Sequence, residues 1–192
     1  MATLWLVRHA QPVVAPGVCY GRLDVPAEVL HTQQCAAALS QALQAQGKEL
    51  GLSALLTSPL QRCAALASAL GQQLELPVRQ DARLAEMDFG VWEGVPWTDI
   101  PKAALDAWTD NFAHHAFGGQ ECTRQVLERV WSALMDAQRA GGTHLWITHA
   151  GVIRAVQHLL AQGQPTIASA QEWPRESPGY GGWVCVELPH AL

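Results

Sequence analysis

Two short apolar segments that lie far apart in the chain each end in a histidine. Residues 4–7 are followed by Arg8 and His9, and residues 145–148 are followed by His149. Short apolar runs of this kind predict buried strands, and two such strands in one sheet would place both imidazoles at the same edge. Because the fixed charge of Arg8 would repel a metal ion, this pattern favours a dianionic phosphate as the ligand.

The rest of the chain alternates between strand and helix patterns. Strands are expected at residues 3–7, 53–57, 77–80, 144–148 and 182–188. Helices are expected at residues 32–46, 60–72, 101–111, 120–140 and 151–163. This alternation predicts an α/β fold, a three-layer α/β/α sandwich with a mainly parallel central sheet. No linker divides the 192 residues, so a single domain over residues 1–192 is expected.

Three segments have little regular pattern. Residues 10–31 form a long connection, which in a compact domain usually has a function. Residues 81–119 are irregular and rich in tryptophan apart from their one short helix, and residues 165–182 are rich in proline and glycine. The pattern of this last segment indicates no role for it.

Composition argues against several classes of protein. With 12 Lys and Arg residues and a net charge of −5, the chain lacks the basic face of a nucleic-acid binder. No uncharged apolar stretch is long enough to span a bilayer, and residues 4–7 are too short for a signal peptide. Five cysteines without a CxxC pair favour a reduced, cytoplasmic compartment over a disulfide framework or a zinc site.

Two further strand ends carry groups suited to phosphate. In parallel sheets, ligands bind beyond the carboxyl ends of the strands. The strand ending at Thr57 is followed by Ser58, the expected N-cap of a helix, and Arg62 lies in the first turn of that helix. The strand before His149 is followed by a helix that begins near Gly151, and free N–H groups at helix N-termini favour anions.

Five motifs in one order resemble the histidine phosphatase superfamily, also called the phosphoglycerate mutase-like family. They are residues 6–10 (LVRHA), 57–62 (TSPLQR), 86–94 (EMDFGVWEG), 118–121 (GGQE) and 148–154 (THAGVIR). Each motif alone is weak evidence, but all five in register span nearly the whole chain. The resemblance implies a phosphoglycerate mutase-like fold and a phosphatase active site.

The resemblance also implies a role for each of five catalytic residues. His9 would attack phosphorus and form a phosphohistidine, which divides the transfer into two steps. Arg8, Arg62 and His149 would hold the phosphoryl oxygens. Glu86 would protonate the leaving alkoxide and then activate water. No metal and no cofactor is implied.

Other residues near these motifs offer alternatives, further contacts and one departure from the family pattern. Asp88 and Glu93 lie close to Glu86 in sequence and are alternative candidates for the acid. Arg22, in the Gly-Arg-x-Asp arrangement of residues 21–24, is expected to contact phosphate or substrate, and Ala150 is expected at the phosphate site. Ala10 stands where the family usually has glycine, which puts in doubt any backbone geometry that needs a positive φ there.

The shortness of the chain and its tryptophan-rich insert resemble the alpha-ribazole phosphatase branch of the family. That branch implies removal of the 5′-phosphate from a ribosyl-dimethylbenzimidazole in cobalamin assembly. An aromatic base would stack well on Trp92, Trp97 or Trp108, although these tryptophans are equally suited to core packing. The expected partner is therefore a small phosphate ester, with alpha-ribazole 5′-phosphate as the leading substrate.

Two other functions remain open from the sequence. A phosphoglycerate mutase-type phosphotransferase would return the phosphoryl group to an acceptor instead of to water. A non-catalytic phosphate-ester-binding module on the same fold would need neither His9 nor Glu86, and Ala10 is the residue that keeps this alternative open. The sequence indicates nothing firm about oligomeric state, and a homodimer is left open.

Overall fold

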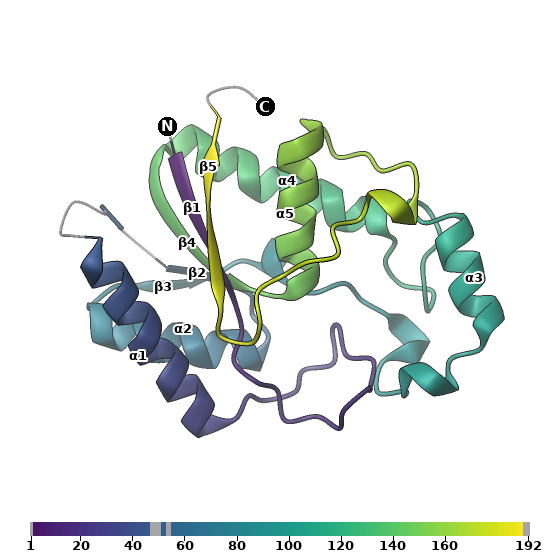
Figure 1. Ribbon diagram of the computed structural model, residues 1–192, viewed down its shortest axis with the longest axis horizontal. Helices are drawn as coiled ribbons and strands as arrows, with labels where there is room; N and C mark the ends of the chain where they lie inside the picture. The colour runs from purple at the N-terminus through teal and green to yellow at the C-terminus, as the bar shows by residue number, and fades with distance from the viewer. Residues whose placement is uncertain (1, 47–50, 53–54, 190–192) are drawn as a thin grey trace.

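The computed structural model describes residues 2–46, 51–52 and 55–189, which form one sheet with helices on both faces (Figure 1). The strands are β1 (Ala2–Arg8), β2 (Leu55–Thr57), β3 (Val78–Gln80), β4 (Gly142–Thr148) and β5 (Trp183–Leu188). The main helices are α1 (Val29–Ala45), α2 (Gln61–Leu74), α3 (Lys102–Asp110), α4 (Thr123–Ala140) and α5 (Ala150–Gln162). The strand order is β3-β2-β4-β1-β5. All neighbouring strands are parallel except β5, which is antiparallel to β1, so the predicted mainly parallel α/β fold is confirmed.

Alternate side chains of β1 belong to two different cores, one on each face of the sheet. Trp5 and Val7 pack with buried residues of α1 and α2, whereas Leu4 and Leu6 pack with buried residues of α4 and α5. This follows from the two-residue period of a strand, which points successive side chains to opposite faces. Burial of each large apolar side chain stabilises the fold by roughly 1.5–3 kcal/mol, and the sheet is therefore held from both sides.

The pairing of β1 with β4 brings the two histidines to one edge. Arg8 is the partner of Thr148 in the parallel register, and the backbone N–H of His9 donates to the Thr148 carbonyl at 2.9 Å. Each strand ends at this point, so His9 and His149 leave the sheet side by side. The strand register thus creates the juxtaposition that the two apolar runs predict.

The antiparallel strand β5 brings the proline- and glycine-rich segment to the same edge. Trp183, the first residue of β5, pairs with Val7 near the end of β1. The backbone N–H of Arg8 donates to Gly182 at 2.9 Å, and the N–H of Gly181 donates to the His9 carbonyl at 3.0 Å. Residues that precede β5 therefore lie beside His9, and Figure 1 shows this segment next to the end of β1.

Several predicted element boundaries are wrong. The first helix begins at Val29 instead of residue 32, and α4 begins at Thr123 instead of residue 120 because Cys122 is its N-cap, with the Gln125 side chain accepting from the Cys122 N–H at 2.9 Å. Ser58 is not the N-cap of α2: Leu60 holds that position, and Asp24 Oδ1 accepts from the Gln61 N–H at 2.7 Å.

The other predicted elements agree with the structure to within two residues at each end. Ser53 and Ala54, the expected start of the second strand, lie outside the described residues. Among the helices of the described ranges, none combines the length and the apolar character needed to cross a bilayer.

Candidate active site

The His9 ring is buried and held in one tautomer. Its Nδ1 lies 2.7 Å from the Ala10 carbonyl. A carbonyl oxygen can only accept, so Nδ1 carries the proton and Nε2 keeps its lone pair. Burial and the charge of Arg62 lower the pKa of His9 from 6.5 to about 3. The ring is therefore neutral at pH 7, as a nucleophile must be.

His149 lies next to His9 at the end of β4. The two ring centroids are 5.2 Å apart, and the planes are tilted by 58°. The His149 Nε2 is 2.8 Å from Ser58 Oγ and 3.4 Å from Cys63 Sγ, so the ring is fixed by residues at the β2–α2 junction. Burial and the charge of Arg62 hold the pKa of His149 well below its ordinary value.

Arg8 is positioned by the segment that precedes β5. Its Nη1 donates to the Pro178 carbonyl at 3.0 Å, and its guanidinium carbon lies 4.1 Å from the centroid of the Tyr180 ring. Such a cation–π contact stabilises the pair by roughly 0.5–2 kcal/mol. The Tyr180 ring is also 5.6 Å from that of His9, and its hydroxyl is 2.8 Å from the Tyr20 hydroxyl.

Arg62 is fully buried in the first turn of α2. Its Nη1 donates to the Leu23 carbonyl at 2.9 Å and its Nη2 to the Gly21 carbonyl at 2.6 Å. The guanidinium carbon lies 5.2 Å from the Tyr20 ring centroid. Two carbonyls and one ring thus fix its position, and its charge acts directly on both histidines.

Glu93 organises the loop that holds Arg62. Its two carboxylate oxygens accept from the backbone N–H groups of Gly21, Arg22, Leu23 and Phe89 at 2.8–3.0 Å. A Cβ at position 21 would overlap the Met87 carbonyl, so only glycine allows this approach. Since Glu93 is fully occupied with four donors, it is not available as the acid.

Glu86 lies at the N-terminus of α5. Its Oε2 accepts from the Gly151 N–H at 3.0 Å and its Oε1 from the Met87 N–H at 3.1 Å. A Cβ at position 151 would overlap this carboxylate, which explains the glycine two residues after His149. Asp88 is engaged differently: its Oδ1 accepts from the Gly90 N–H at 2.9 Å, and it lines a separate cavity.

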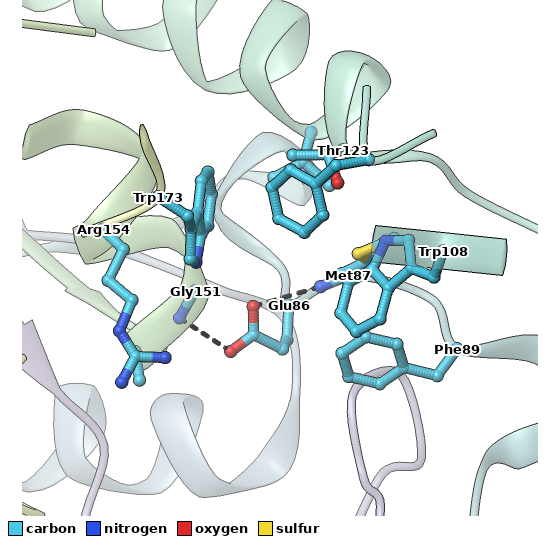
Figure 2. A pocket seen from close by; sticks show the side chains of 11 residues that line it. Glu86, Met87, Phe89, Trp108, Thr123, Gly151, Arg154 and Trp173 are labelled. Carbon is cyan, nitrogen blue, oxygen red and sulfur yellow. Dashed lines mark hydrogen bonds between the residues drawn. The ribbon is translucent and has the colours of Figure 1, made fainter. Parts of the chain in front are cut away.

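A cavity of about 260 Å³ opens beside Glu86 (Figure 2). Apolar side chains form most of its wall: Met87, Phe89, Trp108, Phe112, Val126 and Trp173. Ala150, Gly151, Arg154 and Thr123 complete it. In Figure 2, Arg154 and Trp173 lie on one side of Glu86, with Trp108 and Phe89 on the other. We call this the Glu86 cavity. Its walls suit an aromatic group better than a hydrated one.

Two of the remaining predicted site residues are peripheral. Ala150 is the first residue of α5 and lines the Glu86 cavity. Arg22 lines the neighbouring cavity with Asp88, Glu121 and two glutamines, and it adds a distant positive charge that acts on His149.

The backbone at Ala10 does not adopt the positive φ that would require glycine. Glu75 is the one non-glycine residue with a positive φ among those that the structure describes, so the Ala10 backbone is not left-handed. The Ala10 methyl group is buried in the core that α1 and α2 share with the sheet. The substitution is therefore compatible with the His9–Ala10 hydrogen bond.

Comparison with known proteins assigns the family. The family model for the histidine phosphatase superfamily (branch 1) matches residues 4–176. The chain belongs to this superfamily. It is a phosphatase with the α/β fold of this superfamily.

Several known proteins align with most of the length of this phosphatase. A Hydrogenobacter thermophilus protein named "Putative phosphoserine phosphatase 2" is 29% identical over 165 residues, which are 83% of this chain and 79% of the relative. A mycobacterial glucosyl-3-phosphoglycerate phosphatase in complex with VO3 is 26% identical, with a TM-score of 0.74 over 96% of this chain and 92% of the other. The structure of Bacillus stearothermophilus YhfR, at 24% identity, shows the same fold with a TM-score of 0.77 over 98% of this chain and 92% of the other.

Several site residues of the phosphatase were missed by sequence reasoning. Tyr180 and Trp173 belong to the segment for which the sequence pattern indicates no role, and the pattern around Thr123 predicts only a helix. The antiparallel orientation of β5 brings Tyr180 and Trp173 to the site. The sequence pattern predicts a mainly parallel sheet and does not indicate this orientation. Trp108 lines the Glu86 cavity, whereas Trp97 stacks on Phe117 at 6.0 Å.

Proposed function

We propose that the protein is a metal-independent phosphomonoesterase that acts through a phosphohistidine on His9. The observation that carries this proposal is the neutral His9 ring, whose Nε2 lone pair is free while Nδ1–H donates to Ala10. A phosphate-binding module needs cations, but it needs no imidazole held in this tautomer. The proximity of Arg8, Arg62 and His149 to His9 supports a common phosphate site.

In the first step, Nε2 of His9 attacks phosphorus and the bond from phosphorus to the ester oxygen breaks. The Glu86 carboxylic acid gives its proton to the departing alkoxide. In the second step, Glu86 takes a proton from water, whose oxygen attacks the phosphohistidine, and the N–P bond breaks. Inorganic phosphate leaves, and His9 returns to its neutral form.

Arg8, Arg62 and His149 stabilise the charge on the phosphoryl oxygens. The buried Nε atoms of Arg8 and Arg62 have no hydrogen-bond partner among the described residues, whereas Nη1 of Arg8 and both Nη atoms of Arg62 donate to carbonyls. Donors that are fixed in advance cost no reorganisation during transfer. Arg22 and the N-terminus of α5 at Ala150 add positive potential at the rim of the site.

For the substrate, we propose an alkyl phosphate ester whose leaving group carries an aromatic base, with alpha-ribazole 5′-phosphate first. The Glu86 cavity supports this choice because it adjoins the acid and four aromatic side chains contribute to its walls. At about 260 Å³, it is close to the lower end of small-molecule pockets, roughly 300–1,000 Å³, so one ring system fills it. Phosphoserine and glucosyl-3-phosphoglycerate, in the names of similar proteins, carry charged or hydroxylated groups that match these walls less well.

The test is a substrate panel with chelator-treated protein and the His9→Ala variant. Alpha-ribazole 5′-phosphate, phosphoserine, 3-phosphoglycerate and p-nitrophenyl phosphate are compared for phosphate release. The proposal predicts release without metal, highest kcat/KM for the alpha-ribazole ester, and no release by His9→Ala. Isomerised phosphoglycerate would favour a phosphotransferase, and tight ester binding without turnover would favour a binding module.

A further inference from the structure

Buried polar atoms without a partner are concentrated at the proposed active site. Six such side-chain atoms occur in the described part of the chain: Arg8 Nε, Arg62 Nε, Trp108 Nε1, Thr123 Oγ1, Trp146 Nε1 and Arg154 Nε. Folded proteins leave few buried polar atoms unpaired, and each one calls for a reason. The atoms of Arg8 and Arg62 belong to residues of the proposed phosphate site, where a phosphoryl oxygen could be their acceptor.

Three more of these atoms belong to residues of the Glu86 cavity. They are Trp108 Nε1, Thr123 Oγ1 and Arg154 Nε. An indole N–H and a guanidinium N–H can only donate, and a hydroxyl can also donate. Three residues that line the cavity therefore carry buried donors without acceptors of their own, among walls that are mostly apolar. Its complement is a flat aromatic group that carries a hydrogen-bond acceptor.

Among these three residues, Thr123 is the one whose hydroxyl most clearly lacks another role in the structure. It is the first residue of α4, its side chain is 2% exposed, and it lies above the cavity in Figure 2, away from Arg154. The hydrogen bonds that cap this helix are made by Cys122 and Gln125 instead. The Thr123 hydroxyl thus has no structural task in the described residues and borders the space that the leaving group would fill.

We infer that the Thr123 hydroxyl is a specificity determinant that donates a hydrogen bond to an acceptor atom on an aromatic leaving group. This inference rests on the proposed function, because it places the leaving group in the Glu86 cavity. It narrows the substrate class to esters whose leaving group carries a heteroaromatic ring with a nitrogen or carbonyl acceptor. Carbocyclic rings would fit the same walls but leave the hydroxyl unpaired.

The test uses two esters that differ by one ring atom. In 2-(quinolin-4-yl)ethyl phosphate a nitrogen acceptor stands where 2-(naphthalen-1-yl)ethyl phosphate has a C–H group. The wild-type protein is expected to hydrolyse the quinoline ester with kcat/KM about fivefold to tenfold higher, as one added hydrogen bond allows. In Thr123→Val, which keeps the shape of the side chain, this ratio falls to about one through loss of quinoline turnover.

The matched control is Thr123→Ser, which keeps the hydroxyl and is expected to retain the preference. Hydrolysis of the naphthalene ester by Thr123→Val reports that the site is folded. An equal preference in wild type and Thr123→Val overturns the inference, as does a folded Thr123→Val protein that hydrolyses neither ester. If wild type hydrolyses neither ester and His9 takes up no phosphoryl group, the proposed function itself fails.

Discussion

The Ala10 carbonyl decides which nitrogen of His9 can attack phosphorus. By accepting from Nδ1 at 2.7 Å, it leaves Nε2 as the only unprotonated ring nitrogen. Sequence motifs identified His9, Arg8, Arg62, His149 and Glu86 as neighbours, and the structure brings the first four together. The motifs do not predict the tautomer of His9, because a backbone carbonyl fixes it and a sequence motif does not show where that carbonyl points.

At the same scale, Glu86→Gln separates the two proposed steps. The amide cannot protonate an alkoxide, so turnover of an alkyl phosphate is expected to fall by about 10²- to 10⁴-fold. With p-nitrophenyl phosphate, whose leaving group needs no proton, stopped-flow absorbance should show a burst of one nitrophenolate per site before slow hydrolysis. Asp88→Asn is the control with normal steady-state turnover. A Glu86→Gln protein with neither burst nor slowing would exclude Glu86 from the acid role.

Tyr180 is expected to position Arg8 through its ring. Tyr180→Phe keeps the ring under the guanidinium and loses only the partly buried hydrogen bond to Tyr20, so kcat/KM should stay within about threefold of wild type. Tyr180→Leu removes the cation–π contact, and the inhibition constant for inorganic phosphate should rise by about tenfold. Equal inhibition constants for the two variants would contradict a role for the ring.

Among the structural elements, the loop of residues 20–24 is the one whose contacts the sequence predicts least well. The Gly-Arg-x-Asp arrangement was expected to supply Arg22 as a ligand. In the structure, Asp24 caps α2, and the carbonyls of Gly21 and Leu23 bind Arg62. These contacts join segments about 40 residues apart, since Gly21 and Arg62 are separated by 41 positions, and local patterns do not report them.

The Glu93 carboxylate is expected to maintain this loop and, through it, Arg62. Glu93→Ala leaves four backbone N–H groups without their acceptor, and such unpaired groups cost roughly 1–3 kcal/mol each when buried. The expected result is a lower melting temperature and a rise in KM that exceeds the fall in kcat. Glu128→Ala, at an exposed helical ion pair, is the control. A Glu93→Ala protein with wild-type KM would show that the loop of residues 20–24 keeps its conformation without the Glu93 carboxylate.

In the molecule as a whole, burial of two neutral imidazoles links stability to pH. The folded-state pKa is about 3 for His9 and well below 6.5 for His149. Below pH 6.5 the unfolded chain binds protons at both histidines and the folded chain does not. The free energy of unfolding should therefore decrease as pH falls from about 6.5 toward 3, by roughly 1 kcal/mol per pH unit from His9. His149 adds to this decrease below pH 6.5.

Urea denaturation between pH 7 and pH 5 tests this linkage. His149→Asn should reduce the pH dependence of the free energy of unfolding, whereas His114→Asn, at an exposed position, should leave it unchanged. The linkage is refuted if the pH dependence is the same in wild type and His149→Asn.

Rapid-quench analysis of the phosphoenzyme tests the central claim most directly. The protein is mixed with p-nitrophenyl phosphate, quenched in alkali within one turnover, and digested for mass spectrometry and phosphorus NMR. We expect one phosphoryl group on Nε2 of His9, formed and consumed at rates that account for turnover, and none in His9→Asn. Normal turnover with no phosphorylated peptide, or with the phosphoryl group on His149, would contradict the account.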